Sequence, residues 1–364
     1  MKRPVSADDR LPEADRFLDA PHPRDIERLR GHEAAEEGFL EAYRSGRMHH
    51  AWIISGPLGI GKASLAYRIA KFLAARPDAA APEVTQATDL AVPSETGTSR
   101  QITAGSFPDI ATIRRSWVPE RKVLSGEIRV DDVREGTRLF EHTAIGGGWR
   151  VVIIDSVDEM NTNAANALLK MLEEPPRQAL FLLVSHAPGR LLPTIRSRCR
   201  LLRLQPLPAE TVAAVTADLP PWADLPGERH VEAAGASGGS VRDAIKYLDE
   251  DIAAFRRRIV HMLDMLPRID AKAVRDLAAA VDGRAGAENM AILRHTVEDH
   301  LTDRLRAASE GASPASLAPF AEVWDKLRLS ARDAEIFNLD RRPLVIALFA
   351  NLAEAVRAEQ ASAS

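Results

Sequence analysis

The sequence predicts an α/β fold built on a parallel sheet, followed by helical domains. Residues 151–154 and 179–184 are continuous apolar runs, as expected of central parallel strands that are covered on both faces. A third run, residues 51–55, leads directly into a glycine-rich turn and then into a helical pattern over residues 65–70. The order strand, glycine turn, helix is typical of the start of an α/β domain.

The remaining elements follow from apolar periodicity and from breaks in it. Residues 31–43 and 131–142 carry apolar side chains at three- and four-residue spacing, which predicts helices. A short strand is predicted at 201–204, and the chain from 209 onward is predicted to be helical, with breaks near 217–228, 235–239 and 310–316. Two segments lack a period: residues 1–25, predicted as a loose lead-in, and residues 75–105, predicted as a mobile surface insert.

These elements divide into three predicted domains. The first is the α/β domain, over residues 1–206, which ends at a proline-rich break. A small helical lid over residues 207–250 and an all-helical domain over residues 251–364 follow it.

The composition is that of an ordinary globular protein, with 45% apolar and 27% charged residues. A net charge of −4 argues against strong nucleic-acid binding by the whole chain, so any DNA contact must be local or shared with partners. The single cysteine, Cys199, rules out an intramolecular disulfide and a cysteine-ligated zinc site. We expect a protein of the reducing cytoplasm, without membrane spans, because apolar runs such as 344–350 are too short to cross a bilayer.

The glycine-rich turn, Gly56-Pro57-Leu58-Gly59-Ile60-Gly61-Lys62-Ala63, predicts a phosphate-binding loop (P-loop). Its glycines allow backbone N–H groups to surround phosphate oxygens, and its lysine reaches the β- and γ-phosphates. The Ser or Thr that normally ligates Mg²⁺ is replaced by Ala63. Ser64 lies one residue further on, about 100° around the helix, so we expect its hydroxyl to point away from the metal.

The apolar run 151–154 ends at Asp155, where P-loop folds place the aspartate that holds the water shell of the metal. In a large class of these ATPases a glutamate follows and polarises the attacking water, but here the next residue is Ser156. General-base assistance is typically worth roughly 10²–10⁴ in rate. We therefore expect negligible ATP hydrolysis by this chain, and no resident metal.

Two arginines are candidates for contacts with nucleotide. Arg198, in Thr194-Ile195-Arg196-Ser197-Arg198-Cys199, precedes the last strand on a short loop, from which it can reach the γ-phosphate bound to a neighbouring subunit. Arg242 follows the predicted N-cap Ser240, on the first turn of a helix from which it can reach a nucleotide held by the first domain. From spacing alone, a solvated surface residue is the better interpretation of Arg198, and a lone arginine on a helix, such as Arg242, is usually solvated as well.

These motifs occur in the order found in the AAA+ clamp-loader subunits of bacterial DNA polymerase III. Residues 166–176, Asn-Ala-Leu-Leu-Lys-Met-Leu-Glu-Glu-Pro-Pro, closely resemble the most specific stretch of that family. Three further segments resemble its entry motif, its arginine-finger motif and its sensor-2 helix: Met48-His49-His50-Ala51, Ser197-Arg198-Cys199 and Gly239-Ser240-Val241-Arg242-Asp243-Ala244. Ser185 would fill its sensor-1 position. The resemblance is dense over residues 31–250 and only architectural beyond them.

The resemblance implies a pentamer with gamma/tau and delta subunits that loads a sliding clamp onto primer-template DNA. Residues 251–364 would then form a helical collar. The apolar positions expected in the collar, or in that domain's own core, are Met262, Leu263, Met265, Leu266, Ile292, Leu293, Leu344, Ile346, Leu348 and Phe349.

Departures from the family pattern indicate which kind of subunit this chain resembles. Ala63 and Ser156, and the lack of a cysteine zinc module in residues 75–105, argue against the ATP-hydrolysing gamma/tau subunit. They favour a stator that supplies Arg198 in trans and requires no cofactor and no zinc. Such a subunit belongs to the polymerase holoenzyme but is itself neither a polymerase nor a competent ATPase.

Two alternatives stay open at this point. An active gamma/tau-type ATPase, or a related AAA+ remodeller, predicts Mg²⁺-dependent ATP turnover by the purified chain. A pure scaffold with a relic P-loop predicts no nucleotide binding at all. The P-loop glycines and its lysine are intact: Gly56, Gly59, Gly61 and Lys62. Residual binding of ATP or ADP is therefore compatible with the hypothesis that the chain is a stator.

Overall fold

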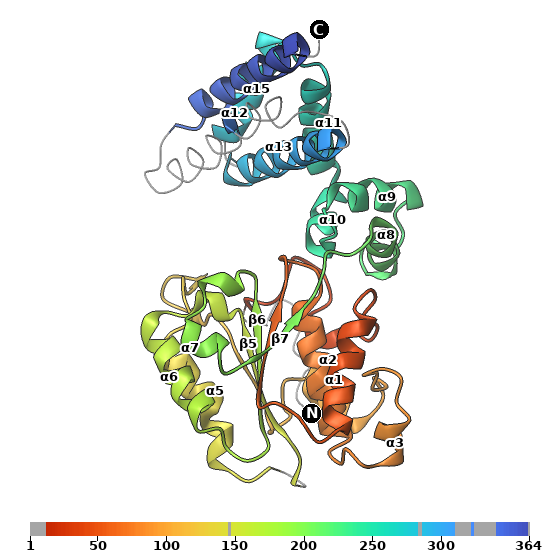
Figure 1. Cartoon of the computed structure of the whole chain (residues 1–364), viewed down its shortest axis with the longest axis vertical. Coiled ribbons are helices and arrows are strands. Elements are labelled where there is room, and N and C mark those ends of the chain that lie inside the picture. The colour runs from red at the N-terminus through yellow and green to blue at the C-terminus, as the bar shows by residue number, and fades with distance from the viewer. Residues whose placement is uncertain (1–11, 145–146, 283–285, 310–321, 324–339, 363–364) are drawn as a thin grey trace. The chain divides into compact units, whose positions relative to one another are not determined.

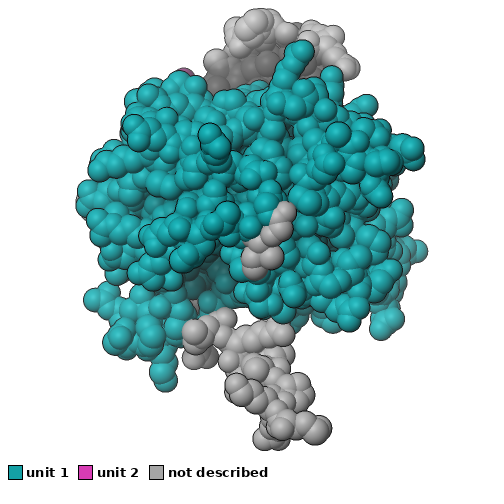
Figure 2. Space-filling view, turned by 90° about the horizontal axis from the view of Figure 1, so that it is seen from below, with its two compact units in different colours: residues 1–245 teal, residues 246–364 magenta. Residues whose placement is uncertain are grey.

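The computed structural model describes residues 12–144, 147–282, 286–309, 322–323 and 340–362. The chain divides into two compact units, residues 1–245 (teal in Figure 2) and residues 246–364. The predicted boundary between the α/β domain and the lid falls inside the first unit, so the three-domain division stays a prediction. The predicted break at 310–316 lies outside the described residues.

The first unit begins with a short 3-10 helix and then alternates helices and strands, and its last helix, α10, runs across the boundary. In chain order its elements are η2 (Pro23–Asp25), α1 (Glu33–Arg44), β1 (Ala51–Ser55), α2 (Lys62–Ala75), α3 (Pro82–Thr85), α4 (Gly97–Thr103), β2 (Ile110–Ile113), β3 (Trp117–Val118), β4 (Val123–Leu124), α5 (Val130–Thr137), η3 (Arg138–Glu141), β5 (Arg150–Asp155), η5 (Val157–Glu159), α6 (Thr162–Glu173), β6 (Ala179–Ser185), η6 (Pro188–Arg190), α7 (Pro193–Arg196), β7 (Arg200–Arg203), α8 (Ala209–Asp218), α9 (Gly227–Ala236) and α10 (Val241–Tyr247).

The main sheet has five parallel strands in the order β2-β5-β6-β1-β7, which confirms the predicted parallel sheet. Its register pairs Val152 of β5 with Phe181 of β6, and Ile53 of β1 with Leu183 of β6. The central strands β1 and β6 are buried along their whole length, as their continuous apolar sequences predict. The edge strand β2 was not predicted, because its four residues carry no long apolar run; only Ile113 among them is buried.

Helices flank both faces of the main sheet, with α1 and α2 on one side and α5 and α6 on the other (Figure 1). Alternating strand residues face two separate apolar layers. Trp52 and Ile54 of β1 pack in the layer formed with α1 and α2, and Ile53 packs in the layer formed with α5 and α6. Because side chains of a strand alternate between faces, a single strand serves both layers. Both faces of the sheet are thereby covered, and its carboxyl edge stays available for a site.

The segment 75–105, predicted as a mobile surface insert, differs from that prediction in the structure. It contains the short helices α3 and α4, and it contributes Val84, Leu90 and Ile102 to the core beside α2. These three side chains are separated by intervals of six and twelve residues. Such spacing produces no helical or strand period, and therefore the sequence pattern did not reveal their burial.

The second unit is helical in its described part. It contains α11 (Glu250–Asp264), α12 (Ala271–Asp282), α13 (Gly286–Ser309) and α15 (Arg342–Ser362). Of the apolar positions expected here, Leu263, Ile292, Leu293, Leu348 and Phe349 are buried, whereas Met265 and Ile346 are exposed. Among the described residues, none of the helices has the length and apolar character needed to cross a membrane.

Candidate functional site

A cavity of about 660 Å³ opens at the carboxyl ends of β1, β5 and β6. Ligands of α/β sheets typically bind at this edge, outside the strand ends. The P-loop, the first turn of α10, part of α8 and the segment before α1 complete its wall. Its charged and polar lining includes Lys62, Ser64, Arg115, Asp155, Ser156, Glu159, His186 and Arg242.

The P-loop backbone has the turned conformation that a phosphate cradle requires. Gly59 and Gly61 have φ values of 80° and 101°, a region that residues with a Cβ rarely adopt. A Cβ on Gly59 would also lie 2.4 Å from Cβ of Arg242, so this glycine allows α10 to approach the loop. Nε2 of the buried His32 lies 2.6 Å from the carbonyl oxygen of Ile60 and braces the loop from the other side.

Lys62 and Asp155 are both withdrawn from solvent beside the loop. Nζ of Lys62 donates to the carbonyl oxygens of Gly56, at 2.8 Å, and Pro57. Burial lowers the pKa of Lys62 to about 8, although the nearby acids oppose this shift. Burial raises the pKa of Asp155 to about 7, and the carboxylate of Asp15 adds to that shift. The charges of Lys62 and Arg114 oppose the shift at Asp155, but burial outweighs them.

The first turn of α2 contains Ala63 and Ser64, and both line the cavity. Ala63 has no oxygen with which to ligate a metal at the usual hydroxyl position. Ser156, at the position of the missing glutamate, is buried and donates to Oδ2 of Asp158 at 3.0 Å. Its hydroxyl is therefore engaged with an acid and is a poor base for activating water.

Asp158 organises the polar end of β6. Its Oδ1 accepts from Oγ of Ser185 at 2.8 Å, and its Oδ2 accepts from the backbone amide of His186 at 2.5 Å. Ser185, the predicted sensor-1 residue, is fully buried by this arrangement. Burial lowers the pKa of His186 to about 4, and the charges of Lys62 and Arg242 lower it further, so its imidazole is neutral at physiological pH.

Arg242 lies at the start of α10, as predicted, and Oγ of Ser240 caps the helix by accepting from the Asp243 amide at 3.2 Å. The backbone amide of Arg242 is 3.4 Å from the carbonyl oxygen of Gly59. Its guanidinium carbon lies 4.4 Å from the centre of the Phe17 ring, which is a cation–π contact. Burial lowers the pKa of Arg242 from its usual range.

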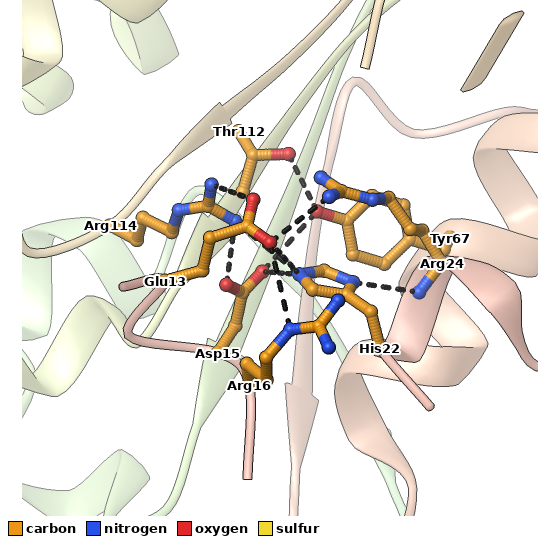
Figure 3. A network of polar contacts seen from close by, with 8 residues as sticks. All are labelled: Glu13, Asp15, Arg16, His22, Arg24, Tyr67, Thr112 and Arg114. Carbon is orange, nitrogen blue, oxygen red and sulfur yellow. Dashed lines mark hydrogen bonds and ion pairs between the residues drawn. The ribbon is translucent and has the colours of Figure 1, made fainter. Parts of the chain in front are cut away.

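Phe17 belongs to an N-terminal arm, defined here as residues 13–24, that lines one side of the cavity. The arm is held by a network of ion pairs and hydrogen bonds (Figure 3). Arg114, which follows β2, donates through Nη1 to Oδ1 of Asp15 at 2.6 Å and through Nη2 to Oε1 of Glu13 at 2.5 Å. Nη2 of Arg24 donates to the other oxygen of Glu13 at 3.0 Å.

His22 and Tyr67 complete this network from within the fold. Nδ1 of His22 accepts from the Arg24 amide at 3.1 Å, so its Nε2 carries the proton and faces Oδ2 of Asp15 at 3.1 Å. The hydroxyl of Tyr67 is 2.9 Å from Oγ1 of Thr112. Burial alone would raise the pKa of Asp15, but the hydrogen bond from His22 and the charge of Arg114 hold it at about 2. The expectation of a loose lead-in was therefore wrong for residues 13–24.

Glu13, Asp15 and His22 lie close enough together to resemble a metal-binding group. Both carboxylates are instead neutralised by Arg114 and Arg24, and both ring nitrogens of His22 are engaged. A cation would have to displace these arginines. The cluster is therefore an ion-pair anchor for the arm.

Arg198 lies on a loop between α7 and β7, and the 193–199 segment contributes none of the described residues that line the cavity. Its Nη2 lies 3.1 Å from Oε1 of Glu173, and its Nη1 donates to the carbonyl oxygen of Thr194 at 3.1 Å. The side chain is 37% exposed, so the guanidinium is oriented but accessible. Burial raises the pKa of the adjacent Cys199 to about 12, which leaves that thiol unreactive.

The family model described as DNA polymerase III, delta subunit, matches residues 31–208, the span that contains the P-loop and the arginine loop. The delta' subunit of DNA polymerase III from Pseudomonas aeruginosa is 37% identical over 214 residues, which are 58% of this chain and 59% of the relative. The Escherichia coli delta' subunit is 35% identical over 175 residues, 48% of each chain. Residues 31–208 are thus similar to DNA polymerase III subunits, in line with the predicted resemblance to AAA+ clamp-loader subunits.

DNA polymerase III subunits of the tau/gamma type also match this chain. The Haemophilus influenzae tau/gamma subunit is 28% identical over 241 residues, 66% of this chain and 32% of the relative. The chain thus spans from about a third to about three fifths of the length of these curated relatives. A gamma subunit-related protein from Thermotoga maritima aligns with 87% of the chain and 99% of its own, at 18% identity and a TM-score of 0.38.

Among the predicted site residues, the structure brings the P-loop, Asp155 and Arg242 to one cavity and leaves Arg198 on a separate loop. Sequence reasoning missed Phe17 and Arg115, which line the cavity together with Glu159. Nε of Arg115 pairs with Oε2 of Glu159 at 2.8 Å. No local motif marks Phe17 or Arg115. Glu173, by contrast, lies inside the recognised 166–176 stretch.

Proposed function

We propose that this chain is a delta-prime-type subunit of the DNA polymerase III clamp loader. In this role it is a stator that supplies Arg198 in trans to an adjacent gamma/tau ATPase during loading of the sliding clamp onto primed DNA. Two relatives named delta' support the subunit type. One observation carries the proposal. Arg198 is oriented and accessible on a loop away from the cavity, and the position in that cavity where a P-loop ligates its metal is occupied by Ala63.

The proposed consequence for the chain's own site is that it binds nucleotide without turning it over. The turned P-loop and a cavity of about 660 Å³ suit a nucleotide, since ligand pockets are typically about 300–1,000 Å³. The missing hydroxyl at Ala63 weakens Mg²⁺ binding, and Ser156 gives no general base. We therefore expect residual ATP or ADP binding, with no cofactor required.

The assembly we propose is a pentamer with gamma/tau and delta subunits. In it, residues 207–250 form the lid and residues 251–364 form the collar, and DNA and clamp are reached through the complex. The exposed Met265 and Ile346 of the second unit are apolar positions that such a collar would cover.

A comparison of two ATPase measurements tests this function. The purified chain should show negligible Mg²⁺-dependent turnover, while a loader reconstituted with its gamma/tau and delta subunits should be more active with the chain than without it. Turnover by the purified chain at a rate comparable to the assembled loader would instead favour a catalytically active gamma/tau-type subunit.

A further inference from the structure

The guanidinium of Arg198 is held by two groups on its own subunit. One is the carbonyl oxygen of Thr194, on the same turn, and the other is Oε1 of Glu173, the last residue of α6. Both distances are 3.1 Å. An arginine has five N–H donors, so these two contacts leave donors for an incoming phosphate.

The location of Glu173 is unfavourable for helix α6 by itself. The carboxyl end of a helix carries a partial negative charge, which repels acidic side chains. Here Glu173 and the C-cap residue Glu174 are both acidic. A residue type that destabilises its own helix is expected where that residue serves a function. Arg198 is the cation that lies against the first of these two acids.

We propose that Glu173 is a positioning residue for Arg198, an inference that rests on the proposed function. Glu173 holds the guanidinium of Arg198 in place beside the α7–β7 loop, so that less conformational freedom is lost when it reaches the neighbour's γ-phosphate. The pair is partly exposed, with side-chain exposures of 37% and 44%, and exposed ion pairs are weak. A triphosphate can therefore take over the guanidinium without a large barrier.

The test is steady-state ATP hydrolysis by the reconstituted loader, with clamp and primer-template DNA present. Glu173→Gln should lower kcat roughly two- to tenfold, the effect of releasing one side chain, and leave KM for ATP unchanged. Glu173→Asp should restore part of the loss. The control, Glu174→Gln, removes the same charge one residue further along and should leave kcat unchanged.

The Arg198→Ala background separates this inference from the proposed function. In that background Glu173→Gln should have no further effect, because it acts through the arginine. If Arg198→Ala lowers kcat but Glu173→Gln matches wild type, raises kcat, or adds its loss to that of Arg198→Ala, the positioning role is wrong and the trans arginine stands. If Arg198→Ala itself leaves kcat unchanged, both proposals are wrong.

Discussion

The ring of Phe17 lies 4.4 Å from the guanidinium carbon of Arg242, and this contact joins the N-terminal arm to the first turn of α10 at the edge of the cavity. The two residues are 225 positions apart, as their numbers give. The arm therefore belongs to the wall of the candidate nucleotide site. Any nucleotide that engages Arg242 must compete with this ring.

Phe17→Ala should strengthen nucleotide binding. Removing the ring frees Arg242 from a cation–π contact of about 0.5–1 kcal/mol, which corresponds to roughly a two- to fivefold gain in affinity. Titration of the purified chain with ADP, followed by calorimetry, measures this change. The neighbouring Leu18, which is 60% exposed, offers a control in Leu18→Ala. Weaker binding by Phe17→Ala would mean that the ring contacts the nucleotide directly.

Asp155→Asn should stabilise the isolated chain at neutral and higher pH. The folded-state pKa of Asp155 is raised to about 7 from 3.8, so the folded protein retains a proton that the unfolded chain loses. This difference lowers the free energy of unfolding as pH rises from about 4 to 7, by on the order of 2–4 kcal/mol. Asparagine carries no charge and removes that penalty. Thermal melts at pH 8 should give a higher Tm for the variant, and a lower Tm would contradict the assigned burial.

Asp15→Asn should destabilise the chain at neutral pH, and the effect should shrink as the pH falls. This pH dependence is the opposite of the one expected at Asp155. The folded-state pKa of Asp15 is lowered to about 2 from 3.8, so its contribution is fully present above pH 4 and is lost as pH falls toward 2. The shift corresponds to about 2 kcal/mol at pH 7. Urea unfolding of wild type and variant at pH 7 and pH 3.5 should show the difference shrinking at the lower pH. An equal difference at both values would exclude an ionised Asp15 as its source.

The sequence predicted the parts of the fold that local patterns encode. The strands β1, β5 and β6 follow from continuous apolar runs, and the P-loop follows from its glycines. The arm could not be predicted in this way. Asp15 and His22 are buried only because Arg114, about a hundred positions along the chain, pairs with that region. Long-range ion pairs leave no periodic pattern in a single sequence, so residues 13–24 resemble a polar lead-in.

Ala63→Ser should restore Mg²⁺ dependence to nucleotide binding. It returns a hydroxyl to the first turn of α2, where P-loops ligate the metal. We expect the affinity for ADP in the presence of Mg²⁺ to rise roughly tenfold over wild type, with little change in EDTA. Ser64→Ala is the matched control and should leave the Mg²⁺ effect as it is. A loss of Mg²⁺-dependent binding in Ser64→Ala would mean that Ser64 already serves as the metal ligand.

Arg198→Ala, with Arg196→Ala as its control, tests the central claim most directly. Both arginines flank Ser197, but Arg196 is exposed whereas Arg198 is oriented by Glu173 and Thr194. The measurement is DNA-stimulated ATP hydrolysis by the reconstituted loader, with assembly checked by size-exclusion chromatography. A trans arginine is worth roughly 10³–10⁵ in rate at its own site, so Arg198→Ala should abolish the share of turnover that depends on that site, and Arg196→Ala should keep it. Equal turnover by the two variants and wild type would contradict the account.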